Sequence, residues 1–373
     1  MQNKNKMRNI KPSLLYIGKI KTLKVFLAFS LLPQILVVKI LSQYPEKVEF
    51  YFSQKIFPIL FNFNHFFLKH IPLSLGDCLY LILGFYLCYS IVNFIFKYRK
   101  LSLKSLINLG ITASLIFLIF QLNWGLNYHR VPLTKKLNAQ KQYSDSLLID
   151  LTSRFVLLSN KLHNQLSESD TTAIVIPYSK KKIVEKVHDN YSDLWESSIK
   201  IPKAKGSIFS LPLSYMGYAG YLNPFTLEAQ VNMRMPKLNL PVTIAHEMAH
   251  QLGYAAENEA NFIALVNTLK NKDPFLKYAA ALFALRHCYS DLNKRNPDQA
   301  KQLIQELNAG IFKNLRENQI FWEQYKNPLE PLFKSSYDNY LKLNGQESGI
   351  KSYNQTVALL VVFYNENEFE FLN

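Results

Sequence analysis

Three long apolar runs in the first third of the chain constrain its fold more than any other feature. They cover residues 25–41, 78–96 and 106–126, and the last two contain no charged residue. A helix needs about 20 apolar residues to cross roughly 30 Å of hydrocarbon, which matches the length of these runs. The first run contains Pro33 and Lys39, but Lys39 lies near one end, where its side chain can reach the interface. The sequence therefore predicts three transmembrane helices.

The positive charge of the chain is concentrated in the same region. The formal net charge is +16, yet residues 1–130 hold 16 Lys and Arg against 3 Asp and Glu, whereas residues 131–373 hold 27 against 24. Basic residues beside apolar runs set the orientation of membrane helices. This distribution argues for the lipid bilayer as a partner and against nucleic acid. We therefore divide the chain into a membrane anchor, residues 1–130, and a second domain, residues 131–373.

The basic stretches beside the runs also predict the orientation. Residues 1–24 contain seven Lys and Arg and no acid, and residues 97–104 contain four basic residues. Basic loops stay in the cytoplasm, so three crossings put the second domain on the outer, periplasmic face of a multi-pass protein of the cytoplasmic (inner) membrane. The aromatic-rich segment between the first two spans, residues 44–77, either lies along the outer membrane surface or forms an ordinary loop.

The second domain is expected to be mainly α-helical with a small β-sheet. Residues 145–166 repeat apolar side chains every three or four positions, as an amphipathic helix does. Similar patterns predict helices at residues 180–196, 275–290, 299–325 and 352–363. Residues 206–233 instead combine Gly and Pro with short aromatic and β-branched runs, which predicts extended structure just before the motif described next.

The motif is a pair of histidines four residues apart with a glutamate between them. Pro241 suits the first turn of a helix and Gly253 suits the position just past its end. His246 and His250 therefore share one helix face and can converge on one metal ion. Glu247 adjoins them and can reach a water molecule in an open coordination position. This arrangement is typical of a zinc hydrolase.

A catalytic zinc ion takes three protein ligands and leaves the fourth position to water. The next predicted helix carries Glu257 and Glu259 in its first turn, which returns to the histidines if the chain reverses at the glycine. Glu257 is the favoured ligand, because Asn261 shares its face and can hold His246 through the other ring nitrogen. Glu259, the alternative ligand, points roughly 200° away.

A reading without metal stays open for the same residues. Two glutamates in the first turn of a helix are stabilised by the helix dipole and need no metal ion. His246 and His250 can likewise be satisfied by ordinary hydrogen bonds within a folded core.

The motif resembles the zincin superfamily, specifically its gluzincin side. The resemblance rests on HEMAH at residues 246–250 and ENEAN at residues 257–261. The spacing between these two motifs is shorter than is usual in gluzincins. The resemblance implies a zincin-like α+β domain with Zn²⁺ held by His246, His250 and Glu257, and Glu247 as general base. It also implies that an edge strand before the helix, within residues 220–232, aligns the substrate.

More narrowly, the chain is similar to a family of uncharacterised bacterial membrane proteins, domain-of-unknown-function family 3810. The likeness rests on the three apolar runs, on the motif with its flanks, and on residues 220–232 and 337–353. This resemblance implies an architecture and no substrate.

These observations predict a membrane-anchored zinc metallopeptidase that acts on a protein or peptide near the membrane. Donors to the oxyanion are sought on the next predicted helix, among Arg286, His287 and Tyr289, or near the C-terminus, among Tyr337, Tyr340 and Tyr353. The alternative is a non-catalytic membrane receptor or assembly factor with a structural zinc site, which a fourth protein ligand would close. A small-molecule transporter is disfavoured, because the second and third spans carry no ionisable residue in their middle.

Overall fold

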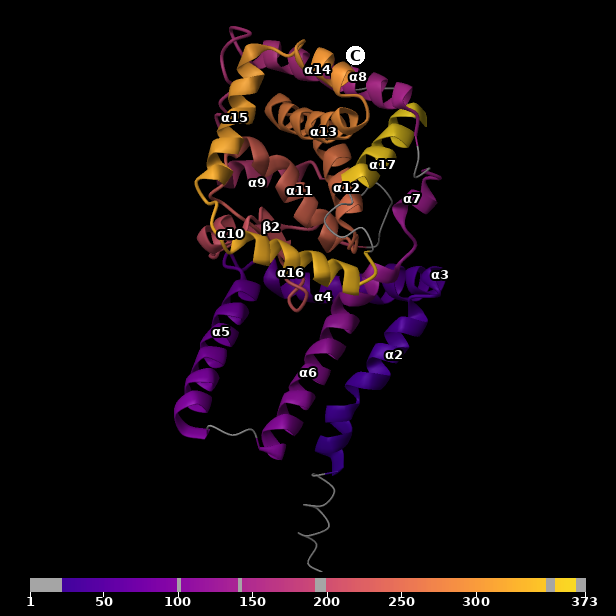
Figure 1. The fold of residues 1–373 in the computed structure, drawn as a ribbon, viewed down its shortest axis with the longest axis vertical. Coiled ribbons are helices and arrows are strands. Elements are labelled where there is room, and N and C mark those ends of the chain that lie inside the picture. Colours follow the sequence, from indigo (N-terminus) through magenta and orange to yellow (C-terminus); the bar gives the residue numbers. More distant parts are fainter. Residues whose placement is uncertain (1–21, 99–101, 140–142, 192–198, 347–352, 367–373) are drawn as a thin grey trace, which may run out of the picture.

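The computed structural model describes residues 22–98, 102–139, 143–191, 199–346 and 353–366. The basic stretch before residue 22, and the ends of two predicted helices at residues 192–196 and 352, lie outside this range. Within it the protein is mainly helical, and three long helices project from one side of a larger body (Figure 1).

The three long helices confirm the predicted spans within a few residues. They cover Thr22–Leu41, Leu75–Phe96 and Leu103–Asn123, and each is long and apolar enough to cross a membrane. The first includes α2 (Leu31–Leu41), the second joins α5 (Leu75–Asn93) to η2 (Phe94–Tyr98), and the third is α6 (Leu103–Asn123). The chain reaches the body at the end of α2, leaves it along α5 and returns along α6 (Figure 1).

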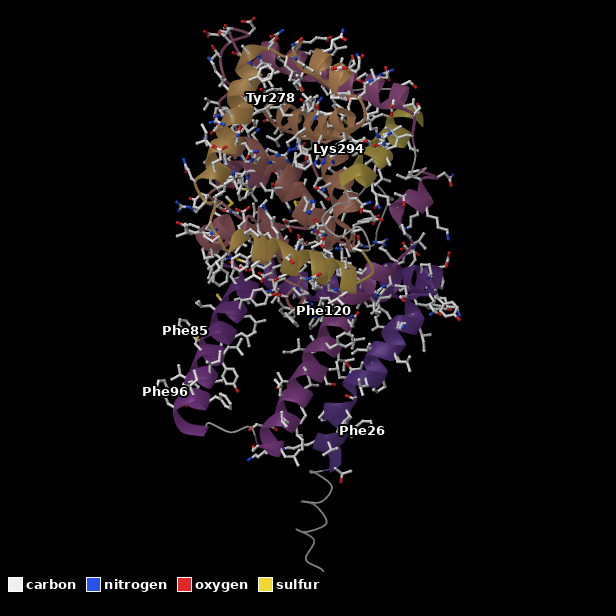
Figure 2. The ribbon with its side chains drawn as sticks, in the orientation of Figure 1. Phe26, Phe85, Phe96, Phe120, Tyr278 and Lys294 are labelled. Carbon is white, nitrogen blue, oxygen red and sulfur yellow. The ribbon has the colours of Figure 1, made fainter. Side chains whose placement is uncertain are left out.

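The first and third spans pack against each other through small and polar side chains. The Ser30 and Ser114 hydroxyls lie 2.7 Å apart, and Gln34 donates to the Ser114 hydroxyl at 2.8 Å. A Cβ atom at Gly110 would lie 3.0 Å from Ala28. Such small residues allow close approach of membrane helices. Among the described residues, no other span packs along the second one in this way: Figure 2 shows the Phe85 side chain projecting away from it.

The segment between the first two spans is helical and forms part of the body. It contains α3 (Pro45–Lys47), the π-helix η1 (Val48–Ile56) and α4 (Phe57–Leu68). Phe57 and Phe61 are buried, and the Phe57 ring lies 5.9 Å from that of Trp124, the residue that follows α6. The hydrophobic core therefore joins residues before and after the last span.

The rest of the body is built from helices around a small sheet. The bounds are η3 (Gly125–His129), α7 (Leu133–Lys136), α8 (Asp145–Leu166), α9 (Lys180–Asp189), α10 (Ser210–Met216), η4 (Lys237–Asn239), α11 (Leu240–Gln251), α12 (Glu257–Lys270), α13 (Pro274–Arg295), α14 (Pro297–Ile304), α15 (Ala309–Glu323), α16 (Glu330–Leu343) and α17 (Tyr353–Glu366). The predicted helix at residues 299–325 is thus two helices, and the break lets the Gly310 N–H donate to the Asp170 carbonyl at 2.8 Å.

The sheet is smaller than the extended pattern predicts. Strands β1 (Ala204–Gly206), β2 (Gly220–Leu222) and β3 (Ala229–Val231) lie in the order β1-β3-β2, with β1 parallel and β2 antiparallel to β3. The expectation of extended structure is wrong for α10, which lies between β1 and β2. Pro212 is tolerated there because it falls in the first turn, where backbone N–H groups have no partner within the helix.

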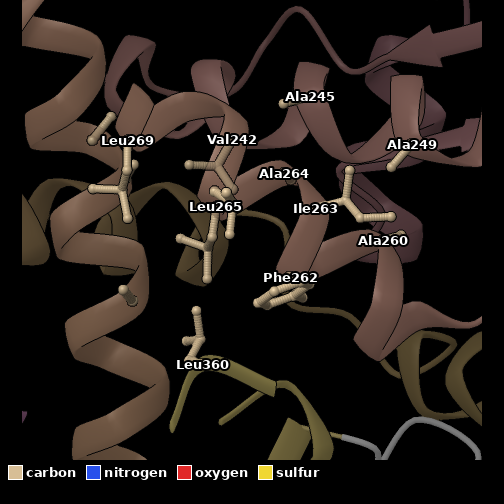
Figure 3. Packing of buried hydrophobic residues seen from close by; sticks show 14 of the residues in the cluster. Val242, Ala245, Ala249, Ala260, Phe262, Ile263, Ala264, Leu265, Leu269 and Leu360 are labelled. Carbon is tan, nitrogen blue, oxygen red and sulfur yellow. The ribbon is translucent and has the colours of Figure 1, made fainter. Parts of the chain in front are cut away.

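Helices α11 and α12 pack against each other at the centre of the body, and small side chains allow their close contact. Figure 3 shows Ala245 and Ala249 on α11 and Ala260 and Ala264 on the neighbouring α12, and all four side chains are fully buried. Small side chains at a helix contact shorten the distance between the axes. The turn at Gly253, with a φ of +83°, reverses the chain between the two helices. The start of α12 is thereby returned to the histidine-bearing face of α11.

Candidate metal centre

His246 and His250 lie side by side on α11, with ring centroids 4.7 Å apart. The His250 Nδ1 atom is 2.7 Å from the Tyr254 carbonyl oxygen. A carbonyl can only accept, so Nδ1 carries the proton and the lone pair of Nε2 is left for a ligand. The His246 ring has Asn261 as a hydrogen-bond partner, which helps to raise its pKa. Both imidazoles are therefore oriented by partners of their own.

Glu257 completes the group from the first turn of α12. One carboxylate oxygen lies 3.3 Å from His246 Nε2 and the other 3.7 Å from His250 Nε2. One potential ligand atom from each of the three residues lies within 4.8 Å of the other two. The Tyr337 hydroxyl of α16 donates to Glu257 at 2.5 Å. The favoured third residue thus joins the histidines.

Glu259 lies elsewhere, although it is only two residues away. Its carboxylate accepts from the Leu133 N–H at 2.6 Å, and its side chain is buried. Burial raises its pKa, while the Leu133 N–H and nearby Arg130 lower it. The carboxylate of Glu259, the alternative ligand, therefore links α12 to α7 by accepting a hydrogen bond from the backbone of α7.

Proximity of the three candidate ligands changes their protonation. Burial opposes a charge on Glu257, but the hydrogen bond from His246 and the charges of both histidines bring its pKa to about 2. Burial likewise opposes a charge on His246, and Glu257 outweighs it, so the pKa of His246 is raised. Burial, with the neighbouring His246, lowers the pKa of His250 to about 4. Glu257 and His250 are thereby in the ionised and neutral forms that bind metals, whereas His246 is shifted toward its protonated form and must release that proton when a metal binds.

Glu247 is buried beside this group with an unsatisfied oxygen. Its side chain is 4% exposed, and Oε2 has no hydrogen-bond partner among the described residues. Burial raises its pKa to about 8. The carboxylate lies against β2, where a Cβ atom on Gly220 would be 2.6 Å from Glu247 Oε1. Only glycine at this position leaves room for the carboxylate.

A cavity of about 700 Å³ opens over the group. It is lined by His246, Glu247, His250, Glu257 and Asn261 together with β2, α10 and α16. Among the candidate oxyanion donors, Arg286, Tyr337 and Tyr340 line it, whereas His287 and Tyr289 are not among the lining residues and Tyr353 begins α17. Concave, largely apolar sites with a few convergent polar groups are typical of ligand binding.

The chemistry of this donor set fits a zinc ion. Two imidazole nitrogens and one carboxylate oxygen are ligands that zinc prefers, and oriented ring nitrogens are typical of metal sites. Within the described residues, no fourth His, Cys, Asp or Glu belongs to the group. The side facing the cavity is therefore left to a non-protein ligand.

A family match covers most of the chain. The family described as "Protein of unknown function (DUF3810)" matches residues 52–361. The chain belongs to the DUF3810 family. This confirms the narrower resemblance drawn from the sequence. No curated protein and no solved structure matches this DUF3810 chain. The zincin resemblance stays a prediction.

Sequence reasoning missed the aromatic side chains that surround the centre of this DUF3810 protein. Trp124 meets His250 edge to face at 6.0 Å, and Tyr128 and Tyr80 also line the cavity. Their only signal is position: aromatic residues gather where membrane helices meet water, and these three lie at or near the ends of spans. That signal does not show which of them face the site.

Proposed function

We propose that this protein is a membrane-anchored, zinc-dependent peptidase whose body lies outside the cytoplasm. The observation that carries the proposal is the convergence of His246, His250 and Glu257 beside Glu247, whose buried carboxylate has an unpaired oxygen. Unsatisfied buried polar groups are uncommon in folded proteins and gather at functional sites. Metal-assisted hydrolysis requires such an arrangement, a buried carboxylate with a raised pKa next to a group suited to zinc.

The chain's own residues account for the proton transfers and the binding of substrate. A zinc ion, when bound, supplies a Lewis acid and lowers the pKa of water. Glu247 then accepts a proton from the attacking water and returns it to the leaving amine as the C–N bond breaks. Arg286 and Tyr340, both on the cavity wall, are the candidate donors to the oxygen that becomes negative, because the single proton of the Tyr337 hydroxyl is donated to Glu257.

The edge strand β2 supports a peptide as substrate. In its antiparallel ladder with β3, the Ala219 carbonyl accepts from the Asn232 N–H, and the Asn223 N–H donates to the Glu228 carbonyl. Polar backbone groups alternate along such a strand, so those of Gly220 and Leu222 point away from β3. Both residues line the cavity. An extended peptide can pair with this edge and place a bond beside Glu247.

The open side of the group favours catalysis over a purely structural zinc site. Structural sites are closed by four protein ligands, whereas catalytic sites keep one position for water or substrate. The candidate group has three, within the described residues, and borders a cavity. A receptor with a structural site has no comparable observation in its favour.

The test is to measure bound zinc and proteolysis together on the full-length chain in detergent. Elemental analysis of wild type, Glu247→Gln and His246→Ala is combined with cleavage of casein and of a peptide library. We expect about one zinc per chain in wild type and Glu247→Gln, little in His246→Ala, and cleavage by wild type alone. Loss of the general base should lower the rate by about 100- to 10,000-fold.

Two outcomes would overturn the proposal. Freshly prepared wild type without zinc removes the metal centre, provided that circular dichroism shows a folded, helical protein. Zinc present at full occupancy without cleavage of any library member favours the receptor instead.

A further inference from the structure

The cavity that holds the candidate metal centre is lined in part by the membrane spans. Tyr80 belongs to α5, and Trp124 directly follows Asn123, the last residue of α6. The Trp124 ring centroid is 6.0 Å from that of His250. The centre therefore lies one side chain away from the point where a span ends, despite the long stretch of sequence between them.

The second span is fixed to the body at its outer end. Glu228 accepts from the N–H groups of Leu75 and Gly76, at 3.3 and 2.6 Å, and Asp77 accepts from the Ile208 N–H at 2.8 Å. Asp77 also accepts from the hydroxyl of Tyr221 in β2. The position of α5 is thus tied to the edge strand beside the candidate centre.

One face of α5 continues from the cavity toward the far side of the membrane. Tyr80, Gly84 and Cys88 are spaced by four residues and so share a face. The Tyr80 ring stacks on that of Tyr221 at 6.0 Å. A Cβ atom at Gly84 would meet nothing within 4 Å, and Cys88 is exposed. The open notch at Gly84 contrasts with Gly110 of α6, which is filled by Ala28.

We propose that the substrate is a membrane protein whose transmembrane helix packs on this α5 face, so that the segment just outside the bilayer enters the cavity. This substrate class rests on the proposed peptidase function. A helix backbone can approach closely at a glycine notch, which lipid chains do not require. The face runs directly into the cavity that contains the unpaired Glu247 oxygen and the free edge of β2. A second copy of the chain on this face would sit in front of that entrance.

The geometry also limits which bond is cut. Water adds its oxygen to the scissile carbonyl carbon, the C–N bond breaks, and the amine leaves with a proton. Trp124, the residue that follows α6, lies 6.0 Å from His250 between ring centroids, and an extended chain advances about 3.3 Å per residue. We therefore expect the centre to be reached within roughly five residues of the end of the substrate helix. Cleavage is therefore expected at a juxtamembrane site.

The first experiment detects docking without catalysis. The full-length chain with Cys78→Ala and Glu247→Gln is placed in phosphatidylethanolamine and phosphatidylglycerol liposomes. The probe is a synthetic Leu/Ala helix of about 20 residues with one cysteine at the depth of Cys88. After oxidation with copper phenanthroline, we expect a disulfide between Cys88 and the probe, and none when Cys88 is replaced by Ala and a cysteine is placed at Tyr86, at nearly the same depth on the opposite face. Equal cross-linking at both positions overturns the proposal.

The second experiment measures cleavage. About ten randomised residues are attached to the helical probe, to a palmitoyl chain, or to no anchor. Gly84→Phe fits the open notch without strain, and we expect it to lower cleavage of the helix-anchored probe by about tenfold. Cleavage of the unanchored probe should not change, and Ile82→Phe, the matched control, should affect none of the three. Mass spectrometry should locate the cut bonds within five residues of the helix.

The outcomes separate this inference from the proposed function. Cross-linking without any cleavage would support the docking face and contradict the proposed peptidase function. Cleavage that is insensitive to Gly84→Phe, or equally reduced for the palmitoyl probe, retains the peptidase and overturns the docking of a helix. A change of oligomeric state in Gly84→Phe, measured by native mass spectrometry, assigns the face to self-association and also overturns the inference.

Discussion

Glu257 and Glu259 are two residues apart at the start of one helix, yet they belong to two different clusters. Glu257 faces His246 and His250 beside the cavity, in a group suited to a metal ion. Glu259 caps the Leu133 N–H and lies near Arg130, away from the histidines. Both are carboxylates in the first turn of α12, and helix geometry alone points them in different directions.

The cluster near Glu259 is an ordinary buried ion network. Arg130 donates from two nitrogens to Glu49, at 2.8 Å each, and Lys136 reaches the same carboxylate at 2.5 Å. Arg130 also donates to the Gly253 carbonyl at 3.0 Å and stacks on the Tyr254 ring. These charges have partners, as buried charges in stable proteins do.

The two clusters differ in whether every buried carboxylate oxygen has a partner, and this difference indicates which cluster is functional. In the ion network each charge is met by the opposite charge or by a backbone group. At the candidate centre, by contrast, Glu247 keeps an oxygen without a partner among the described residues, and the three candidate ligands border a cavity. Such incomplete satisfaction favours a missing ligand over a structural role.

The most direct test of this difference is to neutralise Glu257 and Glu259 in turn. We expect Glu257→Gln to weaken zinc binding by at least about 100-fold, the upper range seen when partners of metal ligands are lost. Glu259→Gln keeps an oxygen for the Leu133 N–H and should bind zinc as wild type does. Competition with a fluorescent chelator measures both affinities. Equal losses in the two variants would place both glutamates in one site.

A smaller effect is expected from Arg130→Met, which removes the centre of the ion network. The Gly253 carbonyl loses this donor and Glu49 keeps Lys136 and Gln54, at a cost of about 2 kcal/mol. The apparent melting temperature in detergent should fall by several degrees, while zinc affinity changes less than tenfold. Arg316→Met is the control, because Arg316 is exposed and its loss should be nearly neutral. Complete zinc loss in Arg130→Met would show that the two clusters act as one.

Much of the fold follows from patterns that can be read locally. The three spans, α8, α11 and α12 are predicted by apolar periodicity and by residues suited to helix ends, such as Pro241 and Gly253. Prediction failed at α10, where aromatic and Pro-rich sequence is typical of strands but the first turn of a helix tolerates Pro212. Helix α16 was not predicted, although it supplies Tyr337.

The candidate centre was partly predictable for the same reason. His246, Glu247, His250 and Glu257 are linked by helix spacing and one glycine turn, which are local features. Trp124, Tyr80 and Gly220 come from distant parts of the chain, and only tertiary packing brings them to the cavity. The last span and the motif are also far apart in the sequence, yet Trp124 joins them directly.

Glu49 of the ion network and Glu247 of the candidate centre should change the stability with pH in opposite directions. Burial opposes the charge of Glu49, but Arg130 and Lys136 hold its pKa at about 2. Its contribution to stability is present above the ordinary value of 4.5 and is lost as the pH falls toward 2. Burial instead raises the pKa of Glu247 from 4.5 to about 8, so its contribution is complete below 4.5 and is lost as the pH rises to 8.

Zinc-free protein should therefore melt at its highest temperature near pH 5 and a few degrees lower on either side. Glu247→Gln should weaken the decline between pH 5 and 8 and leave the acid decline, because its amide does not titrate. Glu49→Gln should weaken the acid decline, which Glu257 shares, and leave the alkaline one, at a lower overall melting temperature. Differential scanning fluorimetry in detergent with a chelator tests both. If Glu247→Gln leaves the alkaline decline unchanged, the carboxylate is not held in an environment that resists its charge, and the contrast between the clusters fails.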